Sequence, residues 1–307
     1  MAEHVLSTQA LTKRYGAATA VHRVDMTIEK GQIYGLVGRN GAGKTTIIRM
    51  ITAQTMPSSG TLSLFGAQEP QVLDRMRART GAMVENPSFY PYLTAKQNLE
   101  YYRIQRGIPG PQVVEAALEQ VGLADTGKKK FKHFSLGMKQ RLGLALALMN
   151  QPDFLLLDEP INGLDPEGIV EFRTLLLRLN RERQTTILIS SHILSELENL
   201  ATHYGFLDGG ILVEQVSAQA LKEKCRACIE LQVDDAAKAA LLLERELDTR
   251  DYEVLPGNVL RLYCHMDEPQ RVTACLVNGG VALFAIENKG ANLEDYFLSL
   301  IGGVHRV

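Results

Sequence analysis

The apolar positions of the longer, N-terminal part of the chain recur as alternating strands and helices require. Residues 32–37, 154–157 and 186–189 form short runs that are almost continuously apolar. Strands that are covered on both faces of a parallel sheet have this composition. Residues 168–181 carry apolar side chains at three-to-four spacing, which predicts a helix between two of these strands. The pattern therefore predicts an α/β core.

Three further segments depart from this core pattern. Residues 5–30 alternate more loosely and predict antiparallel strands, and residues 205–213 predict a hairpin about an Asp-Gly turn. Residues 91–150 have mostly helical periodicity, interrupted at 107–111, where two prolines and two glycines require a loop. We therefore expect an antiparallel β subdomain before the core and a helical insert within it.

A second pattern begins near residue 218. Its expected elements follow the order strand, helix, strand, strand, helix, strand, which is that of a small ferredoxin-like α+β domain, and a last helix follows. They span residues 228–233, 236–247, 252–255, 259–264, 269–277, 281–286 and 293–300. We predict two domains, residues 1–217 and 218–307, and find no catalytic constellation in the second.

Charge and hydropathy limit the partners and the compartment. The chain has 307 residues, of which 45% are hydrophobic, and its formal net charge is -2. Bulk charge therefore favours neither nucleic acid nor an anionic bilayer as a partner. The longest apolar stretches, such as residues 142–149, are far shorter than the ~18 to 20 residues of a membrane span, and no signal segment opens the chain. We expect a protein that folds in the cytoplasm and binds no nucleic acid.

The four cysteines all lie in the last third of the chain. Cys225 and Cys228 form a C-x-x-C pair, but no second C-x-x-C or H-x-x-x-H completes a zinc ligand set. We interpret the cysteines as reduced structural thiols, with a metal site as the alternative.

Residues 38–45 match the phosphate-binding pattern G-x-x-x-x-G-K-[ST] at every fixed position. They follow the apolar run 32–37, so their glycines would turn backbone N–H groups toward a β-phosphate at the start of a helix. Lys44 would reach the β- and γ-phosphates, and the Thr45 hydroxyl would ligate Mg²⁺. The alternative is a glycine-rich turn between a strand and a helix. The expected nucleotide contacts are Gly38, Arg39, Asn40, Gly41, Ala42, Gly43, Lys44, Thr45 and Thr46.

Two carboxylates, Asp158 and Glu159, follow the apolar run 154–157. Because strand side chains alternate between faces, these adjacent carboxylates cannot share one role. Asp158 fits the metal-holding carboxylate of phosphate-loop NTPases, and Glu159 fits a general base that polarises the attacking water. The alternative is a pair of carboxylates that only caps the end of a strand.

Residues 134–141, Phe-Ser-Leu-Gly-Met-Lys-Gln-Arg, lie between the phosphate loop and the acidic strand. Together these motifs give residues 4–217 a resemblance to the ATP-binding-cassette (ABC) transporter ATPases, whose signature is L-S-G-G-Q. Ser135 and Gly137 match that signature, whereas Phe134, Leu136 and Met138 depart from it. Ser135 is a good helix N-cap, and the N–H groups after it form an anion site, which in the family grips the γ-phosphate bound by the partner subunit. The alternative is a plain capped helix.

The resemblance implies further roles at single positions. Tyr15 would stack on adenine through its ring face, unless it is a core or edge tyrosine. His192, which ends the run Ile-Ser-Ser-His, would contact the γ-phosphate and orient the attacking water, unless it is an exposed histidine at a strand end. Residues 163–165, Gly-Leu-Asp, resemble the loop that crosses the dimer seam.

Glu85 departs from the family, which usually has Gln in the loop that links Mg²⁺ and water to the membrane partner. Glu can still coordinate Mg²⁺, so the implied metal ligands are Thr45, Glu85 and Asp158. The charge of Glu85 beside the triphosphate should weaken nucleotide binding unless the metal absorbs it. With residues 89–95, Phe-Tyr-Pro-Tyr-Leu-Thr-Ala, Glu85 is similar to the bacitracin-resistance and lantibiotic-immunity exporters.

The resemblance implies ATP hydrolysis coupled to export through a separate multi-span membrane subunit, with ATP and Mg²⁺ as cofactors. One chain holds one phosphate loop and one signature, so a homodimer or another paired ATPase subunit would hold two ATP head to tail. Hydrolysis removes the γ-phosphate contact and lets this dimer reopen. The ATPase would lie at the inner face of the cell membrane, bound through that subunit. The lysine-rich run 128–133 is either a solvated loop or a contact with an acidic membrane partner or lipid headgroups.

A soluble ABC ATPase that acts in cofactor assembly, or on nucleic acid or ribosomes, is the alternative function. Repair and chromosome members of the family carry long coiled-coil heptads, which this sequence lacks. Ribosome-associated members usually carry two cassettes in one chain, whereas this chain has one. An assembly ATPase is harder to exclude, although the second domain is not typical of one.

Overall fold

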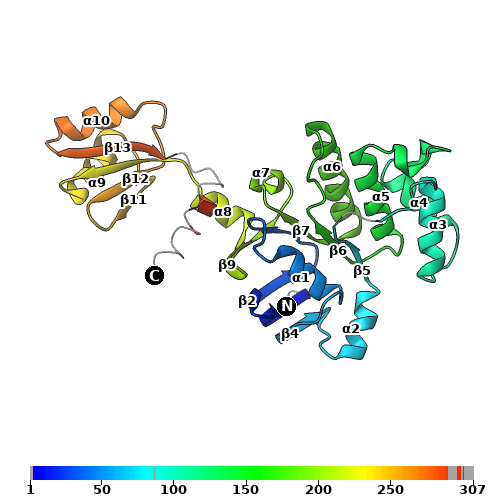
Figure 1. Cartoon of the computed structure of the whole chain (residues 1–307). Helices are drawn as coiled ribbons and strands as arrows, with labels where there is room; N and C mark the ends of the chain where they lie inside the picture. Colours follow the sequence, from blue (N-terminus) through cyan, green and yellow to red (C-terminus); the bar gives the residue numbers. More distant parts are fainter. Residues whose placement is uncertain (1–2, 86–87, 290–295, 299, 301–307) are drawn as a thin grey trace. The chain divides into compact units, whose positions relative to one another are not determined.

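The structure is a computed structural model that describes residues 3–85, 88–289, 296–298 and 300 (Figure 1). The chain divides into two compact units, Met1–Ala218 and Gln219–Val307, and each is described by itself. No helix among the described residues is long and apolar enough to cross a membrane.

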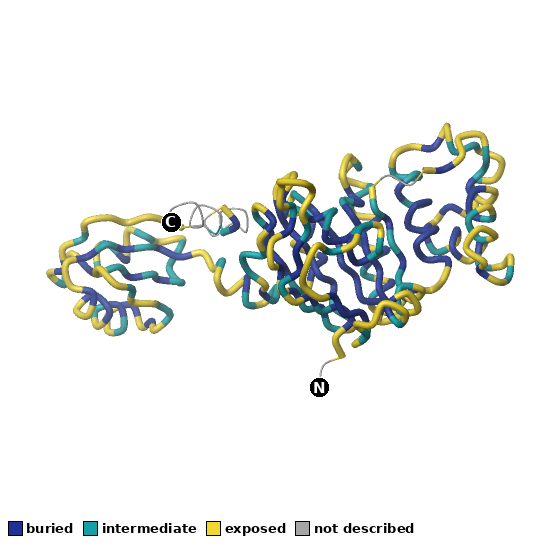
Figure 2. Tube along the Cα trace, turned by 60° about the horizontal axis from the view of Figure 1, so that its bottom comes forward, coloured by how far each residue is buried: buried dark blue, intermediate teal, exposed yellow. Residues whose placement is uncertain are grey.

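A six-stranded sheet forms the centre of the first unit. It consists of β3 (Ile33–Val37), β5 (Thr80–Met83), β6 (Phe154–Asp158), β7 (Thr186–Ser191), β8 (His203–Asp208) and β9 (Ile211–Ser217). The strand order is β5-β6-β7-β3-β8-β9, with every neighbouring pair parallel except β8 and β9. Every residue of β3, β6 and β7 is buried. Figure 2 shows dark blue, buried runs through the middle of the first unit. The strands predicted from continuous apolar runs, and the predicted hairpin, are therefore confirmed.

A three-stranded antiparallel sheet packs on the same core. It consists of β1 (His4–Tyr15), β2 (Ala18–Glu29) and β4 (Ser59–Leu64), in the order β2-β1-β4. Helix α1 (Lys44–Ile51) joins the two sheets, because its apolar side chains share one buried cluster with those of β1, β2, β4 and β6. The sequence predicted β1 and β2 but not β4, half of which is exposed.

The segment between β5 and β6 is helical, as predicted. It contains α3 (Ala95–Gln105), α4 (Gln112–Gln120), α5 (Leu136–Leu148) and 3-10 turns at Ala124–Thr126 and Phe131–His133. No helix covers residues 106–111, which include the predicted break. The remaining helices of this unit are α2 (Pro70–Arg77), α6 (Pro166–Arg183) and α7 (Leu194–Leu197), of which only α6 was predicted.

The second unit has a ferredoxin-like sheet. Helix α8 (Ala218–Lys224) leads into β10 (Cys228–Val233), α9 (Ala236–Glu246), β11 (Tyr252–Leu255), β12 (Val259–Leu262), α10 (Pro269–Asn278) and β13 (Leu283–Lys289). The strands pair antiparallel in the order β11-β12-β10-β13, so the predicted α+β fold is confirmed. No disulfide links the four cysteines. The predicted last helix, 293–300, lies mostly outside the described residues.

Gly81 sets how closely the helical insert approaches the central sheet. A Cβ atom on Gly81 would lie 2.2 Å from the carbonyl oxygen of Ala147, in the last turn of α5. Backbone cannot yield as a side chain does, so we expect Gly81→Ala to lower the free energy of unfolding by about 1 to 3 kcal/mol, the usual range for overpacking. Urea unfolding followed by circular dichroism would measure this loss.

Gly35→Ala is the matched control, because the nearest atom to its Cβ would be the end of the Leu197 side chain at 3.0 Å. We expect a smaller loss for this variant, since a leucine side chain can shift its rotamer. Equal unfolding free energies for both variants would show that α5 does not press on β5 as described.

Candidate functional site

The phosphate-binding sequence forms the turn between β3 and α1. Glycine is required at two of its positions. A Cβ on Gly38 would lie 2.5 Å from the carbonyl oxygen of Leu207, and a Cβ on Gly43 would lie 2.5 Å from the carbonyl oxygen of Ala20. Gly43 has φ 107° and is the N-cap of α1, with no side chain capping the helix. The first-turn N–H groups of α1 therefore have no capping side chain, an arrangement that suits a phosphate.

Lys44 is buried at the start of α1, with 5% of its side chain exposed. Its Nζ donates hydrogen bonds to the carbonyl oxygens of Gly38 at 2.6 Å and Arg39 at 3.2 Å. The same Nζ lies 3.1 Å from Oε1 of Glu159. A buried ammonium requires such partners, because an unpaired buried charge is costly.

The two carboxylates at the end of β6 have different surroundings. Asp158 is buried and accepts a hydrogen bond from Ser190 Oγ at 2.6 Å. Strand alternation places it on the face whose other β6 side chains pack in the cluster with α1. Glu159 has φ 49°, a left-handed conformation that is uncommon outside glycine, and its carboxylate lies at Lys44. The two side chains therefore occupy separate positions.

His192 meets Glu159 from the end of β7. Its Nδ1 lies 2.6 Å from Oε2 of Glu159, so the two oxygens of this carboxylate contact two different residues. The sequence named Lys44, Glu159 and His192 from three distant segments, and the structure brings them together. Parallel pairing of β6, β7 and β3 explains this, because the carboxyl ends of parallel strands meet at one edge of a sheet.

Sequence reasoning missed two polar residues of this site. Ser190 donates to Asp158, and its Oγ also accepts the backbone N–H of Glu159 at 3.0 Å, so one hydroxyl fixes both acidic positions. Asn162 lines a cavity of about 240 Å³ together with Ala20, Glu159 and residues 40–46. A signal for Ser190 was present, because the apolar run of β7 ends in two serines beside the acidic end of β6.

The cavity fits a triphosphate with a magnesium ion. Its walls contain the loop backbone, Lys44, Thr45 and Thr46. Asp158 does not line it and ends β6, which β7 separates from β3 in the sheet. Backbone N–H groups and an ammonium suit phosphate oxygens, and a hydroxyl with a carboxylate suits Mg²⁺. These residues would hold the nucleotide and the metal.

Glu85 pairs with an arginine and not with the other two implied metal ligands. Arg49 Nη2 donates to its Oε1 at 2.5 Å, and the Glu85 side chain is 63% exposed. Over residues 3–85, 88–289 and the few described beyond them, no three His, Cys, Asp or Glu side chains could together hold a metal ion. Coordination by Glu85 would therefore require its carboxylate to leave Arg49.

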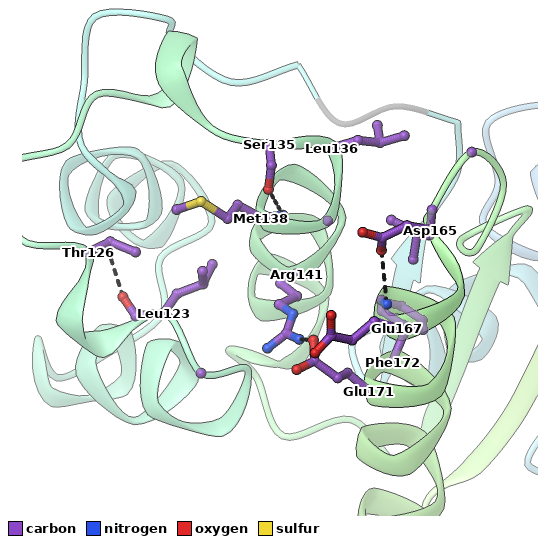
Figure 3. Close-up of a pocket in the computed structure, with 15 residues that line it drawn as sticks. Leu123, Thr126, Ser135, Leu136, Met138, Arg141, Asp165, Glu167, Glu171 and Phe172 are labelled. Carbon is purple, nitrogen blue, oxygen red and sulfur yellow. Dashed lines mark hydrogen bonds and ion pairs between the residues drawn. The ribbon is translucent and has the colours of Figure 1, made fainter.

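The signature residues border a different cavity, of about 650 Å³, between α5 and α6 (Figure 3). Ser135 is the N-cap of α5, and its Oγ accepts the backbone N–H of Met138 at 3.3 Å. Ser135 and Leu136 lie at one end of this cavity in Figure 3, and Arg141 forms an ion pair with Glu171 deeper in it. Neither Ser135 nor Gly137 lines the cavity at Lys44.

Leu136 stands where the family signature has Gly. Its side chain packs toward residues 163–165, the loop predicted to cross the dimer seam. A Cβ on Gly163 would lie 3.0 Å from Leu136 Cδ2, so this leucine covers the glycine of its own chain. Its backbone N–H stays in the first turn of α5, at the serine-capped end. The side-chain departure from the signature thus leaves the helix start intact.

Tyr15 ends β1, and 48% of it is exposed. The Lys13 ammonium lies 5.0 Å from the ring centroid. Tyr15 pairs with Ala18 of β2. Two residues further along β2, the carbonyl oxygen of Ala20 faces Gly43 of the phosphate loop. An accessible ring beside this loop is available for stacking, which is compatible with an adenine contact.

Comparisons with known proteins agree with this site. A family model described as ABC transporter matches residues 21–162. The chain is 43% identical to the bacitracin transport ATP-binding protein BcrA of Bacillus licheniformis, over 97% of this chain and 98% of that protein. It is 42% identical to the lantibiotic transport ATP-binding protein SrtF of Streptococcus pyogenes, over 69% of this chain and 90% of that protein.

A solved structure shares the fold of the first unit. It is the dimeric, post-hydrolysis structure of the ATP-binding cassette MJ0796 bound to ADP and Pi, with a TM-score of 0.62 and 22% identity over 69% of this chain and 98% of that chain. The resemblance inferred from the motifs is confirmed. The chain belongs to the ABC transporter family and has the fold of an ATP-binding cassette.

Proposed function

We propose that this chain is the ATP-hydrolysing subunit of a transporter that exports a peptide antibiotic of the bacitracin or lantibiotic kind. The observation that most supports hydrolysis is the convergence of Lys44, Glu159 and His192 beside the phosphate loop. The cargo is inferred from the names of the two curated relatives, one of which matches nearly the whole chain. Residues 1–217 form the catalytic domain in this proposal, and 218–307 an accessory domain.

Nucleotide binding would begin with an exchange at Lys44. Its ammonium now contacts one carboxylate oxygen and two backbone carbonyls. A triphosphate offers more negative charge in the same place, so Lys44 would turn to the β- and γ-phosphates and release Glu159. The N–H groups of the loop and of the first turn of α1 would take the remaining phosphate oxygens.

Glu159, once released from Lys44, would act as the general base. Its carboxylate would accept a proton from the attacking water, and His192, which contacts it at 2.6 Å, would hold it and the water in line with the γ-phosphate. Asp158 and Thr45 would hold Mg²⁺, which neutralises charge on the triphosphate. Ser190 keeps the two acidic positions apart through its two hydrogen bonds.

Two copies would be needed for one complete site. Ser135 lies on a cavity other than the one at Lys44, so within one chain the signature cannot close over that nucleotide. A head-to-tail homodimer brings Ser135 of one copy to the γ-phosphate on the other. Loss of this phosphate removes the contact that favours the closed pair, and this opening would drive transport.

The membrane subunit would dock on the helical insert. Backbone hydrogen bonds from Phe131 to Leu93 and from Lys132 to Pro91 join the lysine-rich run to the segment that follows Glu85. The Lys132 ammonium lies 4.9 Å from the centroid of the Tyr92 ring, which is 71% exposed. This surface suits an acidic, cytoplasmic segment of a membrane protein, and the chain would lie at the inner membrane face through that contact.

We expect Glu159→Gln to keep ATP affinity within a few-fold while lowering turnover by about 10²- to 10⁴-fold, the usual range for a lost general base. The amide cannot accept the proton of the water, yet it keeps the size of the side chain. Phosphate release would measure turnover, and calorimetry would measure binding. Lys44→Ala is the contrasting variant, because it should weaken ATP binding itself. Near-normal hydrolysis by Glu159→Gln would exclude Glu159 as the base.

The same Glu159→Gln variant should form a stable dimer with Mg²⁺-ATP, because the closed pair cannot release phosphate. Adding Ser135→Arg should leave it monomeric, since a long cation replaces the cap that faces the partner's nucleotide. Light scattering after size exclusion would report the mass. Thr61→Arg, on the exposed edge strand β4, is the control and should still dimerise. Dimerisation of both arginine variants would contradict the proposed seam.

Docking through the insert predicts that the chain co-purifies from its native membranes with one multi-span protein. Lys128→Glu combined with Lys132→Glu should reduce that recovery by about tenfold, because both lysines are exposed and would repel an acidic segment. Lys30→Glu, in the exposed turn between β2 and β3, should not change the recovery. Bacterial cells that express the pair should survive bacitracin, and cells with Glu159→Gln should not. Recovery of soluble partners alone would contradict the transporter function.

A further inference from the structure

Arg49 and Glu85 form an ion pair that the family pattern does not account for. Arg49 Nη2 donates to Glu85 Oε1 at 2.5 Å, with side-chain exposures of 36% and 63%. Glu85 stands where the resemblance implies an uncharged Gln, so the chain carries an additional negative charge at this loop. The arginine supplies the matching positive charge from a different element, α1.

The position of Arg49 in α1 relates this pair to the metal site. Arg49 follows Thr45 by four residues, so the two side chains lie on one face of the helix, one turn apart. Thr45 lines the cavity of the phosphate loop. Glu85 follows β5, whose Met83 pairs with Leu157 of β6, so it lies at the same edge of the sheet as Asp158.

Glu85 has a backbone that limits where its side chain can go. Its φ is 58°, a left-handed conformation that few residues other than glycine adopt. Such a conformation persists only where surrounding contacts maintain it. The guanidinium of Arg49 holds the side chain from this fixed backbone position, at the sheet edge that also carries Asp158.

We propose that Arg49 is a positioning residue that competes with Mg²⁺ for the carboxylate of Glu85. This inference rests on the proposed function, because it assumes that Mg²⁺ and ATP bind at Lys44 and Thr45. Without metal, Arg49 neutralises Glu85 and protects the triphosphate from its charge. With metal, the carboxylate leaves Arg49 and joins the ion. Arg49 thereby makes a Glu tolerable at a position where its charge would otherwise repel the nucleotide.

The proposal predicts opposite changes with and without metal in Arg49→Gln. In excess EDTA, the uncompensated carboxylate should weaken the binding of adenylyl imidodiphosphate, a non-hydrolysable ATP analogue, by roughly three- to tenfold. In saturating Mg²⁺, a carboxylate freed from Arg49 is a better ligand, so the gain in affinity from Mg²⁺ should exceed that of the wild type. Isothermal titration calorimetry of the full chain in both buffers measures the two affinities.

The double variant separates this mechanism from a structural role. Glu85→Gln alone should gain less affinity from Mg²⁺ than the wild type, because it lacks the carboxylate ligand. Arg49→Gln should then leave the gain in affinity from Mg²⁺ unchanged in the Glu85→Gln background, because no carboxylate remains for which the metal and Arg49 could compete. Arg49 also lies in the last turn of α1, where a cation stabilises the helix dipole, and a loss through the helix alone would persist in that background.

Two control variants accompany the two single variants and the double variant. Arg79→Gln removes a similar exposed pair, with Asp153 at 2.7 Å, at the amino end of β5, whereas Glu85 follows its carboxyl end. It should not change affinity in either buffer. Arg49→Lys keeps the charge and should restore most of the metal-free affinity.

The outcomes are distinguishable. A loss on Arg49→Gln that is the same with and without Mg²⁺, or an equal change in the gain from Mg²⁺ in the Glu85→Gln background, would overturn the competition. Unchanged affinity in both buffers would overturn it as well. If the wild-type chain bound no nucleotide in either buffer, the proposed function itself would fail, which is a separate result.

Discussion

A buried ammonium group cannot remain without negative partners, and this constraint governs the first unit. Lys44 is almost fully buried at the start of α1, where a helix dipole adds further positive character. In the structure two carbonyl oxygens and the Glu159 carboxylate satisfy it. The same lysine that would bind a triphosphate therefore also restrains Glu159, the base that would act on it. Binding of the triphosphate and release of the base would thus be one event.

The parallel sheet makes this arrangement possible. The loop follows β3, the acidic pair ends β6, and His192 follows β7, and these three strands are neighbours in the sheet. Their carboxyl ends meet at one edge, so short polar extensions of each apolar strand converge without long loops. Ser190 then uses one hydroxyl to hold Asp158 and the Glu159 backbone, which fixes the two adjacent carboxylates in different directions.

Much of this could be predicted from local sequence. Continuous apolar runs predicted β3, β6 and β7, since burial on both faces leaves no place for polar side chains. The fixed spacing of the loop predicted Lys44 and Thr45, because its glycines leave few other conformations. Weakly patterned elements such as β4 and α2 escaped prediction, since exposure on one side dilutes the apolar signal. The pairing of Arg49 with Glu85 also escaped it, because thirty-six positions separate two residues whose contact depends on how α1 packs on the sheet that contains β5.

The sequence by itself determined which chemical groups the chain brings to a nucleotide, because a phosphate loop, an acidic strand end and a capped signature helix each depend on neighbouring residues. It also determined the two patterns of strand and helix that distinguish the units. Only the tertiary structure decided which of these groups touch: Glu159 contacts both Lys44 and His192, Glu85 contacts Arg49, and Ser135 borders a separate cavity. The physical reason is that ion pairs and hydrogen bonds act over a few ångströms, whereas sequence spacing says nothing of distances across a sheet.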